Sequence, residues 1–467
     1  MSKKTAKQIL PFVLLAAVAI VAMFVKPVPD FVPGEKDPQY SSADIAWVLV
    51  STALVFLMTP GLAFFYGGMV NRKNVISTMI KSTVAAGVVG LLWVVCGFSL
   101  AFGETVNGVI GNPTTFAFFQ GVKGGAAWPL ANTIPLTLFS LFQLMFAIIT
   151  PGLVVGALAE RIRFTSFILF IVLFSLLVYA PVAHWSWHPE GFLAKMGAFD
   201  FAGGTVVHIT AGCAALAGAL VLKRRKSHIE NKEIPPANVP YVLIGTGLLW
   251  FGWFGFNAGS AVGATPLAVN AFGTTTTAAA SAGLTWMFFD VIKGKKPSVL
   301  GFCIGAVVGL VAITPAAGYV GIPQSIIVGL VGALVSNVAV AIKQKSTLDD
   351  TLDVFPCHGL GGMVGMLLTG VFASTAVNSA GPNGLFYGNP GFFFTQLKAM
   401  GIVVGYSFAV SYGIFKLINF VVPIRVSELE EELGLDETQH NEKYMQGHLL
   451  VHHNGEIKET PTEKLVK

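Results

Sequence analysis

The sequence predicts an all-α, polytopic membrane protein. Of its 467 residues, 54% are hydrophobic and only 11% are charged. Several separate apolar runs reach roughly 18 residues, the length that crosses a bilayer as a helix, whereas barrel strands would give short alternating segments. The 52 glycines exceed the usual share of about 7%, and small residues let membrane helices pack closely. We therefore expect a tight helical bundle.

Eleven core helices are expected, one for each continuous apolar run. Together they form a membrane domain over residues 44–422, preceded by residues 1–43 and followed by a polar tail over residues 423–467. In chain order, the expected helices span residues 44–70, 75–102, 131–158, 164–181, 203–222, 239–257, 268–291, 299–314, 325–342, 354–373 and 392–422.

Basic residues alternate between the loops and predict the orientation in the membrane. Cytoplasmic loops carry the excess of Lys and Arg, so the first core helix is expected to start outside and the C-terminus to lie in the cytoplasm. The intervening loops hold only Lys123 and Lys195. A cytoplasmic membrane is the expected location, with no nucleic-acid partner. The basic loops hold Arg72 and Lys73; Arg161 and Arg163; Lys223, Arg224, Arg225, Lys226 and Lys232; Lys293, Lys295 and Lys296; Lys343 and Lys345.

The first 26 residues, MSKKTAKQILPFVLLAAVAIVAMFVK, combine a basic lead with an apolar run. This pattern fits either a secretory signal peptide or an extra anchoring helix. Either one delivers the following outer linker, and hence the start of the core, to the outer face. Both alternatives stay open at this point.

Ten of the expected helices divide into five plus five, followed by the long final helix over residues 392–422. An odd number of helices per half makes the second half enter the membrane upside down, which is the inverted-repeat architecture of many transporters. The fifth helix carries His208 and the tenth carries His358. Such repeats place a site near the midplane between the halves.

The two histidines are the chief functional candidates, because an ionisable residue inside a membrane helix is costly to bury. A single buried histidine is often structural, but two at equivalent positions can share a proton and line a polar path. At about 1.5 Å per residue, His208 lies ~12 Å inward from Asp200 and His358 ~8 Å from Asp353. In a core of roughly 30 Å this leaves a gap near 10 Å, which closes only if both helices begin inset from the membrane faces.

Other residues are expected to support a route through the bundle. Asp200 is interpreted as a structural cap, because a carboxylate at a helix start accepts the free backbone N–H groups; its charge would also attract cations. Trp187, expected in an outer loop, and Ser260, just beyond a helix end, are predicted to meet at the outer mouth. There the indole would attract a cation and the hydroxyl would accept a hydrogen bond.

Enzymatic and cofactor-dependent functions receive little support. The sequence lacks HExxH and a G-x-S-x-G nucleophile elbow. A haem-binding cytochrome remains a rival, since histidines on separate helices can ligate haem, but only two histidines lie mid-helix. No metal, cofactor or disulfide is expected from the four cysteines, Cys96, Cys213, Cys303 and Cys357, which lack metal-type spacing.

Five motifs carry a resemblance to a known family: TPGLAFFYGGMVNRKNV (residues 59–75), GLVVGALAERIRF (152–164), DFAGGTVVH (200–208), GWFGFNAGS (252–260) and DVFPCHGLGG (353–362). Together they resemble the Amt/Mep/Rh ammonium transporters, specifically the bacterial Amt branch. The resemblance runs from about residue 44 to the acidic tail. It implies a homotrimer that moves ammonium or ammonia, with one pore in each subunit.

The resemblance also implies roles for single residues. By position in the motifs, an outer cation-recruitment site resembles Trp187, Ser260, Phe142 and Phe146, and the rings that close the outer pore resemble Phe146 and Phe256. The pore histidines resemble His208 and His358, with Trp253 in the pore wall and Asp200 as the buried structural acid.

Physical chemistry gives these implied roles a mechanism. Ammonium and potassium have similar size and equal charge, but only ammonium donates hydrogen bonds and can lose a proton. Carrying an intact ion past Phe146 and Phe256 would cost several kcal/mol of desolvation, which neutral ammonia largely avoids. We expect the proton to follow separately, so that transport is electrogenic; passive ammonia conduction is the alternative.

Two departures from the family pattern stand out. Pro356 and Cys357 precede His358 where many members have small residues, and Asn441 stands where glycine is common. The acidic tail keeps GLD and His440 and is expected to bind a PII-type regulatory protein, although a merely solvated end is the alternative. An ammonium sensor with the same fold is the second functional hypothesis.

Overall fold

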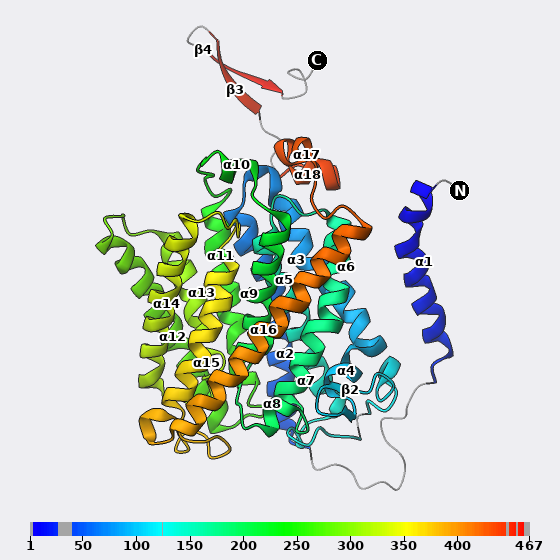
Figure 1. Ribbon diagram of the computed structural model, residues 1–467, viewed down its shortest axis with the longest axis vertical. Helices are drawn as coiled ribbons and strands as arrows, with labels where there is room; N and C mark the ends of the chain where they lie inside the picture. Colours follow the sequence, from blue (N-terminus) through cyan, green and yellow to red (C-terminus); the bar gives the residue numbers. More distant parts are fainter. Residues whose placement is uncertain (1–2, 27–39, 124, 445–447, 454–455, 462–467) are drawn as a thin grey trace.

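The protein is a bundle of long, closely packed helices (Figure 1). The computed structural model describes residues 3–26, 40–123, 125–444, 448–453 and 456–461. The first half of the bundle contains α2 (Ser42–Met69), η1 (Arg72–Asn74), α3 (Val75–Leu92), η2 (Trp93–Gly97), α4 (Phe98–Phe102), η3 (Ala117–Phe119), α5 (Leu136–Leu158), α6 (Phe164–Phe174), η4 (Ser175–Tyr179), α7 (Ala180–Trp187), α8 (Phe192–Lys195), η5 (Gly204–Ile209), α9 (Thr210–Leu222) and α10 (Lys226–Ile229).

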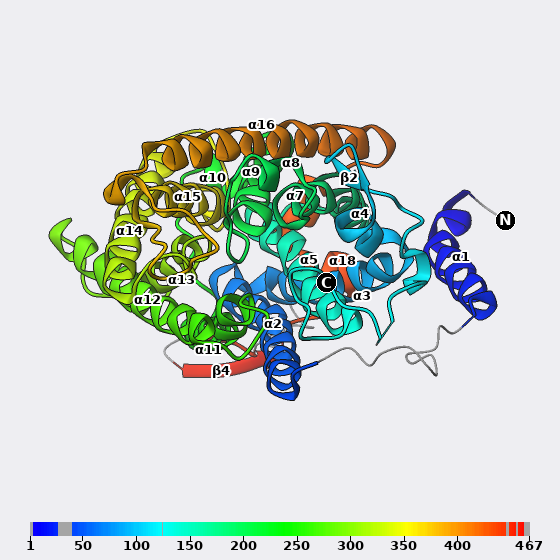
Figure 2. The same ribbon diagram turned by 90° about the horizontal axis from the view of Figure 1, so that it is seen from below.

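The second half repeats the pattern and ends in a long diagonal helix, α16, which crosses the outside of the bundle (Figures 1 and 2). Two short hairpins, β1–β2 and β3–β4, are the strand pairs of the described residues. The remaining elements are α11 (Val239–Trp253), η6 (Phe254–Ala258), α12 (Pro266–Ile292), α13 (Val299–Ile313), α14 (Ile322–Gln344), η7 (Phe355–Leu360), α15 (Gly361–Phe372), η8 (Leu385–Tyr387), α16 (Pro390–Val421), α17 (Glu428–Leu433), α18 (Leu435–His440), β1 (Thr105–Val106), β2 (Ile110–Gly111), β3 (His448–His453) and β4 (Glu456–Pro461).

Helices occupy all eleven positions that the sequence predicts, so the all-α membrane fold is confirmed. Within the described residues, nine helices are long and apolar enough to cross a membrane by length and composition. The other two expected spans correspond to α12, which contains four consecutive threonines, and to α13, which has only 15 residues. A helix therefore stands at each of the eleven expected positions, but α12 and α13 do not have both the length and the apolar character of a membrane span.

Two expected boundaries were wrong. The third helix begins at Leu136 rather than at residue 131, because Pro135 takes an extended conformation at its N-cap. The fourth does not end at Pro181 but continues to Trp187, since Pro181 directly follows the π-helical turn η4, which interrupts the regular hydrogen-bond ladder. Trp187, expected in a loop, is therefore the last residue of a helix.

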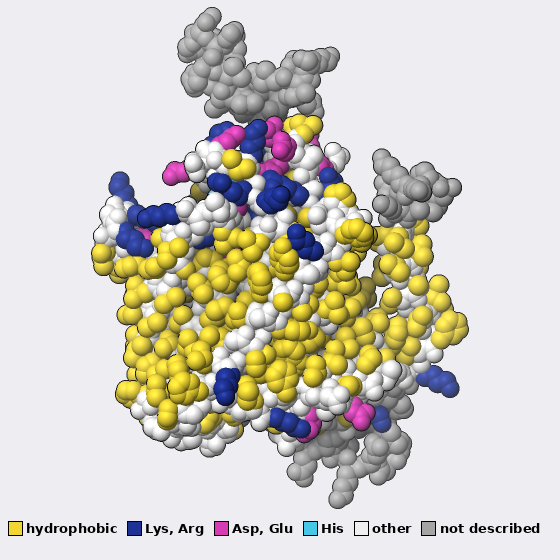
Figure 3. Space-filling view, in the orientation of Figure 1, with side chains coloured by type: hydrophobic (Ala, Val, Ile, Leu, Met, Phe, Trp, Pro, Cys, Tyr) yellow, Lys and Arg dark blue, Asp and Glu magenta, His cyan; other side chains and the backbone are white. Residues whose placement is uncertain are grey.

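Charge and apolar surface divide the molecule into a belt and two faces. Figure 3 shows a belt of hydrophobic side chains, with most Lys and Arg side chains gathered above it. We call this upper side the basic face; it carries α10, α17 and α18. The lower side, with α8 and the β1–β2 hairpin, is called the opposite face (Figure 1).

The two histidine-bearing helices cross at the centre of the bundle. The segment η5–α9 ends before the basic Lys223, whereas η7–α15 begins beside Asp353, which pairs with Lys343, and runs the other way. Glycines permit the close crossing: a Cβ at Gly212 would lie 2.2 Å from the Cα of Gly359. Only glycine fits there, so the backbones approach closely enough to bring their side chains together.

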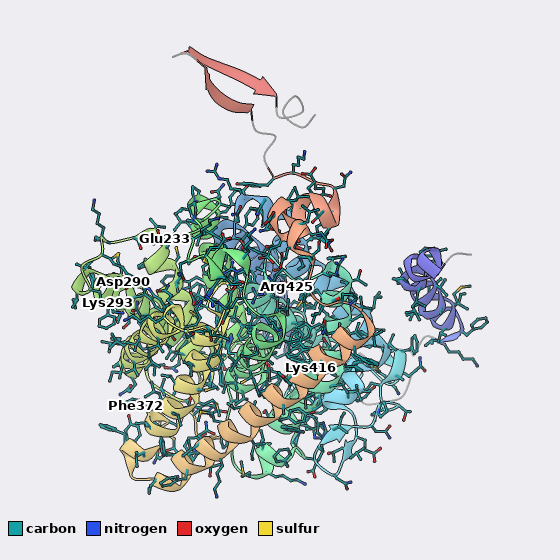
Figure 4. All side chains as sticks on the ribbon, turned by 45° about the horizontal axis from the view of Figure 1, so that its top comes forward. Glu233, Asp290, Lys293, Phe372, Lys416 and Arg425 are labelled. Atoms are coloured by element: carbon teal, nitrogen blue, oxygen red, sulfur yellow. The ribbon has the colours of Figure 1, made fainter. Side chains whose placement is uncertain are left out.

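The tail helices pack onto the basic face. Ser427 caps α17 in a capping box with Glu430. The carboxylate of Asp436 accepts the Ser77 N–H at 2.7 Å at the start of α3, and burial raises the pKa of this carboxyl. Arg425, labelled in Figure 4, donates to the backbone oxygen of Leu222 at 2.9 Å.

Asn441 takes the left-handed conformation at the end of α18, with φ of 56°, so it substitutes for the glycine that is common there.

The helix α1 (Lys3–Phe24) stands beside the bundle (Figures 1 and 2), with most of its side chains from Ile9 onward exposed. Residues 27–39, which join α1 to the core, lie outside the described residues.

Candidate functional site

Asp200 fixes the start of the helix that carries His208. Its carboxylate accepts backbone N–H groups from Gly203 at 2.9 Å, Gly204 at 2.7 Å and Thr205 at 2.7 Å, and it also accepts the Thr205 hydroxyl. The free N–H groups of a helix start are thereby satisfied. This is the hydrogen-bond geometry of a helix cap. Because Asp200 is only 8% exposed, the segment η5 that it caps begins well inside the protein.

Asp350 plays the same part for His358, although it was not among the residues predicted from the sequence. Its carboxylate accepts the N–H groups of Val354 at 3.0 Å and Phe355 at 2.7 Å, and the residue is fully buried. The signal was the spacing, because each histidine lies eight positions after its aspartate. Asp353, chosen instead as the reference for depth, lies closer to the surface.

The histidines meet, although the expected depths left a gap between them. Their Nδ1 atoms are 3.4 Å apart and their ring centroids 5.4 Å apart. The gap closes because both helices begin inset, at the buried carboxylates of Asp200 and Asp350. A hydrogen bond between two Nδ1 atoms needs one donor and one acceptor, so the rings take different protonation states or tautomers at that atom.

Three residues implied for the pore stand in π-helical turns: His208 in η5, Phe256 in η6 and His358 in η7. Such turns are rare and recur at functional sites, where they change the direction of a side chain. Pro356, which departs from the family pattern, lies near the start of η7, where a proline is tolerated. The apolar periodicity of these segments predicts regular helices and gives no sign of the turns.

A cavity of about 120 Å³ lies towards the opposite face, and we call it the outer cavity after the outer mouth expected from the sequence. Its walls include all four residues of the implied recruitment site. The ring centroids of Phe142 and Phe146 are 4.9 Å apart, and those of Phe146 and Trp187 are 5.8 Å apart. Trp187 donates its indole N–H to the backbone oxygen of Asp200 at 3.0 Å, and Ser260 donates its hydroxyl to that of Phe256 at 2.8 Å.

A closed aromatic layer separates the outer cavity from the histidines. The rings of Phe146 and Phe256 lie 4.5 Å apart, centroid to centroid, and both side chains are buried. Below them, Trp253 stacks on His208 at 5.4 Å and 19°. The space beside His208 and His358 is only about 10 Å³ and is otherwise lined by apolar side chains. It accommodates about one water-sized molecule.

A larger cavity of about 340 Å³ opens on the basic side of the histidines. His358 borders both this inner cavity and the narrow space beside the histidine pair. Asp353 lines the inner cavity and forms an ion pair of 2.6 Å with Lys343. Burial raises the pKa of the Asp353 carboxyl to about 6, although the neighbouring Lys343 opposes the shift. The basic side thus offers a larger cavity that reaches His358, whereas the aromatic layer closes the other side.

The described residues contain no group of three or more His, Cys, Asp or Glu side chains that could hold a metal ion. The four cysteines are all free. The outer histidines, His184 and His188, stack on one another at 4.4 Å, away from the histidine pair in the bundle.

Comparison with known proteins gives a consistent result. The family model described as Ammonium Transporter Family matches residues 46–445. An ammonium transporter of Bacillus subtilis (strain 168) is 46% identical over 406 residues, which cover 86% of this chain and 98% of that protein.

Solved structures share the fold. The crystal structure of Candida albicans Mep2 superposes with a TM-score of 0.79 at 36% identity, covering 84% of this chain and 88% of that chain. A structure described as a Sensor Amt Protein gives a TM-score of 0.78 at 28% identity, covering 85% and 98%. The chain belongs to the ammonium transporter family, a family of transport proteins rather than enzymes.

Proposed function

We propose that the protein moves ammonium across the cytoplasmic membrane as ammonia and a separately relayed proton. The observation that carries this proposal is the contact between His208 and His358, which occupy an otherwise apolar and very narrow space between two cavities. A hydrated ion does not fit a space of about 10 Å³. A neutral molecule the size of water does fit.

The outer cavity recruits the cation in this scheme. The faces of Trp187 and Phe146 attract a positive charge through their π electrons, and the oxygen of Ser260 accepts a hydrogen bond from it. Because Ser260 already donates its own proton to Phe256, its lone pairs are available to an N–H donor. Phe142 closes the side of this site as a wall of the cavity.

Deprotonation precedes passage through the aromatic layer. Moving an intact cation between Phe146 and Phe256 would cost several kcal/mol, because no polar group there replaces its hydration. Moving neutral ammonia between the same rings costs much less free energy, because its hydration is weaker. The histidine pair then donates and accepts hydrogen bonds to the neutral molecule, and Trp253 holds the ring of His208 in place by stacking. Ammonium gives its proton to water in the outer cavity. A proton is then taken up by His208, passed to His358 across their Nδ1 contact and released to water in the inner cavity, which makes the cycle electrogenic.

Orientation and assembly follow from charge and from family resemblance. We place the basic face in the cytoplasm, because Lys and Arg favour that side, and the recruitment cavity outside. A homotrimer is proposed, with exposed apolar residues of the bundle facing lipid or neighbouring copies. The membrane domain is proposed to span residues 44–422, with residues 1–43 as a signal peptide or anchoring helix and outer linker.

The tail over residues 423–467 is proposed as a regulatory segment that binds a PII-type protein. Its described helices contact the loops beside the inner cavity, since Glu431 accepts the backbone N–H of Lys226 at 2.8 Å. A partner that binds the tail would therefore stand close to the inner mouth.

A sensor with the same fold is the second candidate, and it has less support. The structure described as a sensor is 28% identical, whereas the Bacillus subtilis transporter is 46% identical.

Currents across a solid-supported membrane test the proposal. Proteoliposomes are given ammonium and then potassium, and we expect a current with ammonium alone. His208→Ala and His358→Ala should change its size or selectivity, while His228→Ala, on α10 outside the membrane, serves as the control. Unchanged ammonium currents and methylammonium uptake in both variants would refute the role of the pair. Ammonium uptake without any current would refute the electrogenic step.

A further inference from the structure

Gln143 is a buried polar residue that the proposed transport route leaves without a role. It lies on α5, is 9% exposed and lines the outer cavity. Its carbonyl oxygen Oε1 is buried and has no hydrogen-bond partner among the described residues. Buried polar atoms without a partner are rare in folded proteins and need an explanation. A bound molecule in the cavity would supply one.

The position of Gln143 on its helix places it between two aromatic pairs. Residues three and four apart share a helix face, so Gln143 stands between Phe139 and Phe146. Phe139 stacks against Trp128 with centroids 5.3 Å apart and an angle of 8°. Phe146 meets Trp187 edge to face at 5.8 Å. All five side chains line the same cavity of about 120 Å³.

The chemistry of ammonium explains why a second oxygen matters there. The ion carries four N–H donors, and the aromatic faces attract its charge without replacing all of its hydrogen bonds to water. Ser260 supplies one oxygen acceptor. A cation that enters the cavity and keeps only this bond would lose much of its hydration without compensation. A side-chain amide oxygen is a suitable second acceptor, and rotation of the amide can present it to a cation.

We propose that Gln143 is a direct ligand of the cation in the outer cavity, with Oε1 accepting one N–H while Ser260 accepts another. This inference rests on the proposed function and adds a specificity residue to it. Ammonium has four N–H groups to distribute among the oxygens and rings, whereas methylammonium has three and a methyl group. Removing one oxygen should therefore weaken the binding of ammonium more than that of methylammonium.

The test measures the concentration of ammonium, and of methylammonium, that gives half of the maximal current in the same proteoliposomes. Gln143→Leu keeps the size of the side chain but removes the oxygen, and we expect the value for ammonium to rise about tenfold. The value for methylammonium should rise less. Gln143→Glu keeps an acceptor and should retain ammonium binding. Gln120→Leu is the matched control, because the Gln120 amide bonds the backbone oxygen of Lys26 in an outer loop and should leave both values unchanged.

The possible outcomes separate the inference from the proposed function. Equal values in the wild type and in Gln143→Leu, with normal wild-type currents, would overturn the role of Gln143 alone. An equal rise for ammonium and methylammonium would also overturn it as a specificity residue. Absence of any ammonium current or uptake in the wild type would overturn the proposed function instead. If Gln143→Leu fails to assemble, Gln143→Met, which is unbranched and flexible, provides the same comparison.

Discussion

The two histidine helices have the same construction but different surroundings. Each begins at a buried aspartate, has a left-handed residue three positions later, and presents its histidine eight positions after the aspartate, within a π-helical turn. His208 lies beneath the aromatic layer and stacks on Trp253, whereas His358 borders the open inner cavity. The repeated backbone therefore builds a symmetric pair, while the residues around it make the route asymmetric.

This asymmetry separates two tasks. In the proposed route, the closed side excludes hydrated ions, because the ring centroids of Phe146 and Phe256 lie only 4.5 Å apart. On the other side, a molecule that has passed His358 would enter the larger cavity directly. The proposed route needs only one selective barrier, so the second half of the chain does not have to repeat it.

The largest expected effect concerns the two capping aspartates. Asp200 accepts four backbone N–H groups and Asp350 accepts two. Removing either carboxylate leaves buried donors unpaired, at about 1 kcal/mol or more for each. We expect Asp200→Ala to lower the free energy of unfolding by ~4 kcal/mol and Asp350→Ala by ~2 kcal/mol. Thermal unfolding of the detergent-solubilised protein measures the difference.

Asparagine at the same two positions is the control, since it keeps one acceptor oxygen and should recover part of each loss. Equal losses for the two alanine variants would show that the caps do not differ in strength. That result would contradict the comparison between the halves.

Much of the fold could be predicted from the sequence, because long apolar runs and the alternation of basic loops depend on the membrane alone. His208 and His358 stand out for the same reason, as ionisable groups inside apolar helices. Their contact could not be predicted, since a depth measured from Asp353 along a regular helix leaves the rings apart. The cap at Asp350 was signalled only by its spacing from His358, which matches that of Asp200 from His208. The π-helical turns depend on tertiary packing, which no local pattern reports.

The outer cavity shows the same limit. General chemistry predicts that Trp187 and Ser260 meet, and the motifs imply the two phenylalanines beside them. Gln143 was missed because one polar residue on a buried helix face is common in sequences. Its significance appears only when the cavity and the missing hydrogen bond are seen together.

A smaller effect is expected at the paired left-handed positions, Gly203 with φ of 121° and Asp353 with φ of 58°. A Cβ at Gly203 would lie 2.8 Å from Cγ2 of Val207, so Gly203→Ala adds crowding to backbone strain and should cost about 1–3 kcal/mol. Asp353→Gly relieves strain but loses the ion pair with Lys343, and should change stability by less than about 1 kcal/mol. Unfolding midpoints compare the two variants.

Gly197→Ala separates strain from crowding. Gly197 also has a positive φ, of 81°, but a Cβ there would meet no atom within 4 Å. It should therefore cost less than Gly203→Ala. A cost equal to that of Gly203→Ala would mean that contact with Val207 contributes nothing.

The smallest expected effect is a pH dependence of stability that comes from Asp353, in the half that carries His358. Burial raises the pKa of this carboxyl from 3.8 to about 6 in the folded protein. Between about pH 4 and pH 6 the folded protein holds a proton that the unfolded chain has lost, so this group's contribution to stability falls as pH rises through that window. Asp353→Asn removes the titration. The variant should therefore gain stability relative to the wild type from pH 4.5 to pH 7, by about 1 kcal/mol after allowance for the partial exposure of the side chain. Unfolding midpoints measured across this range would show the gain, and a difference that stays constant with pH would mean that Asp353 is charged throughout.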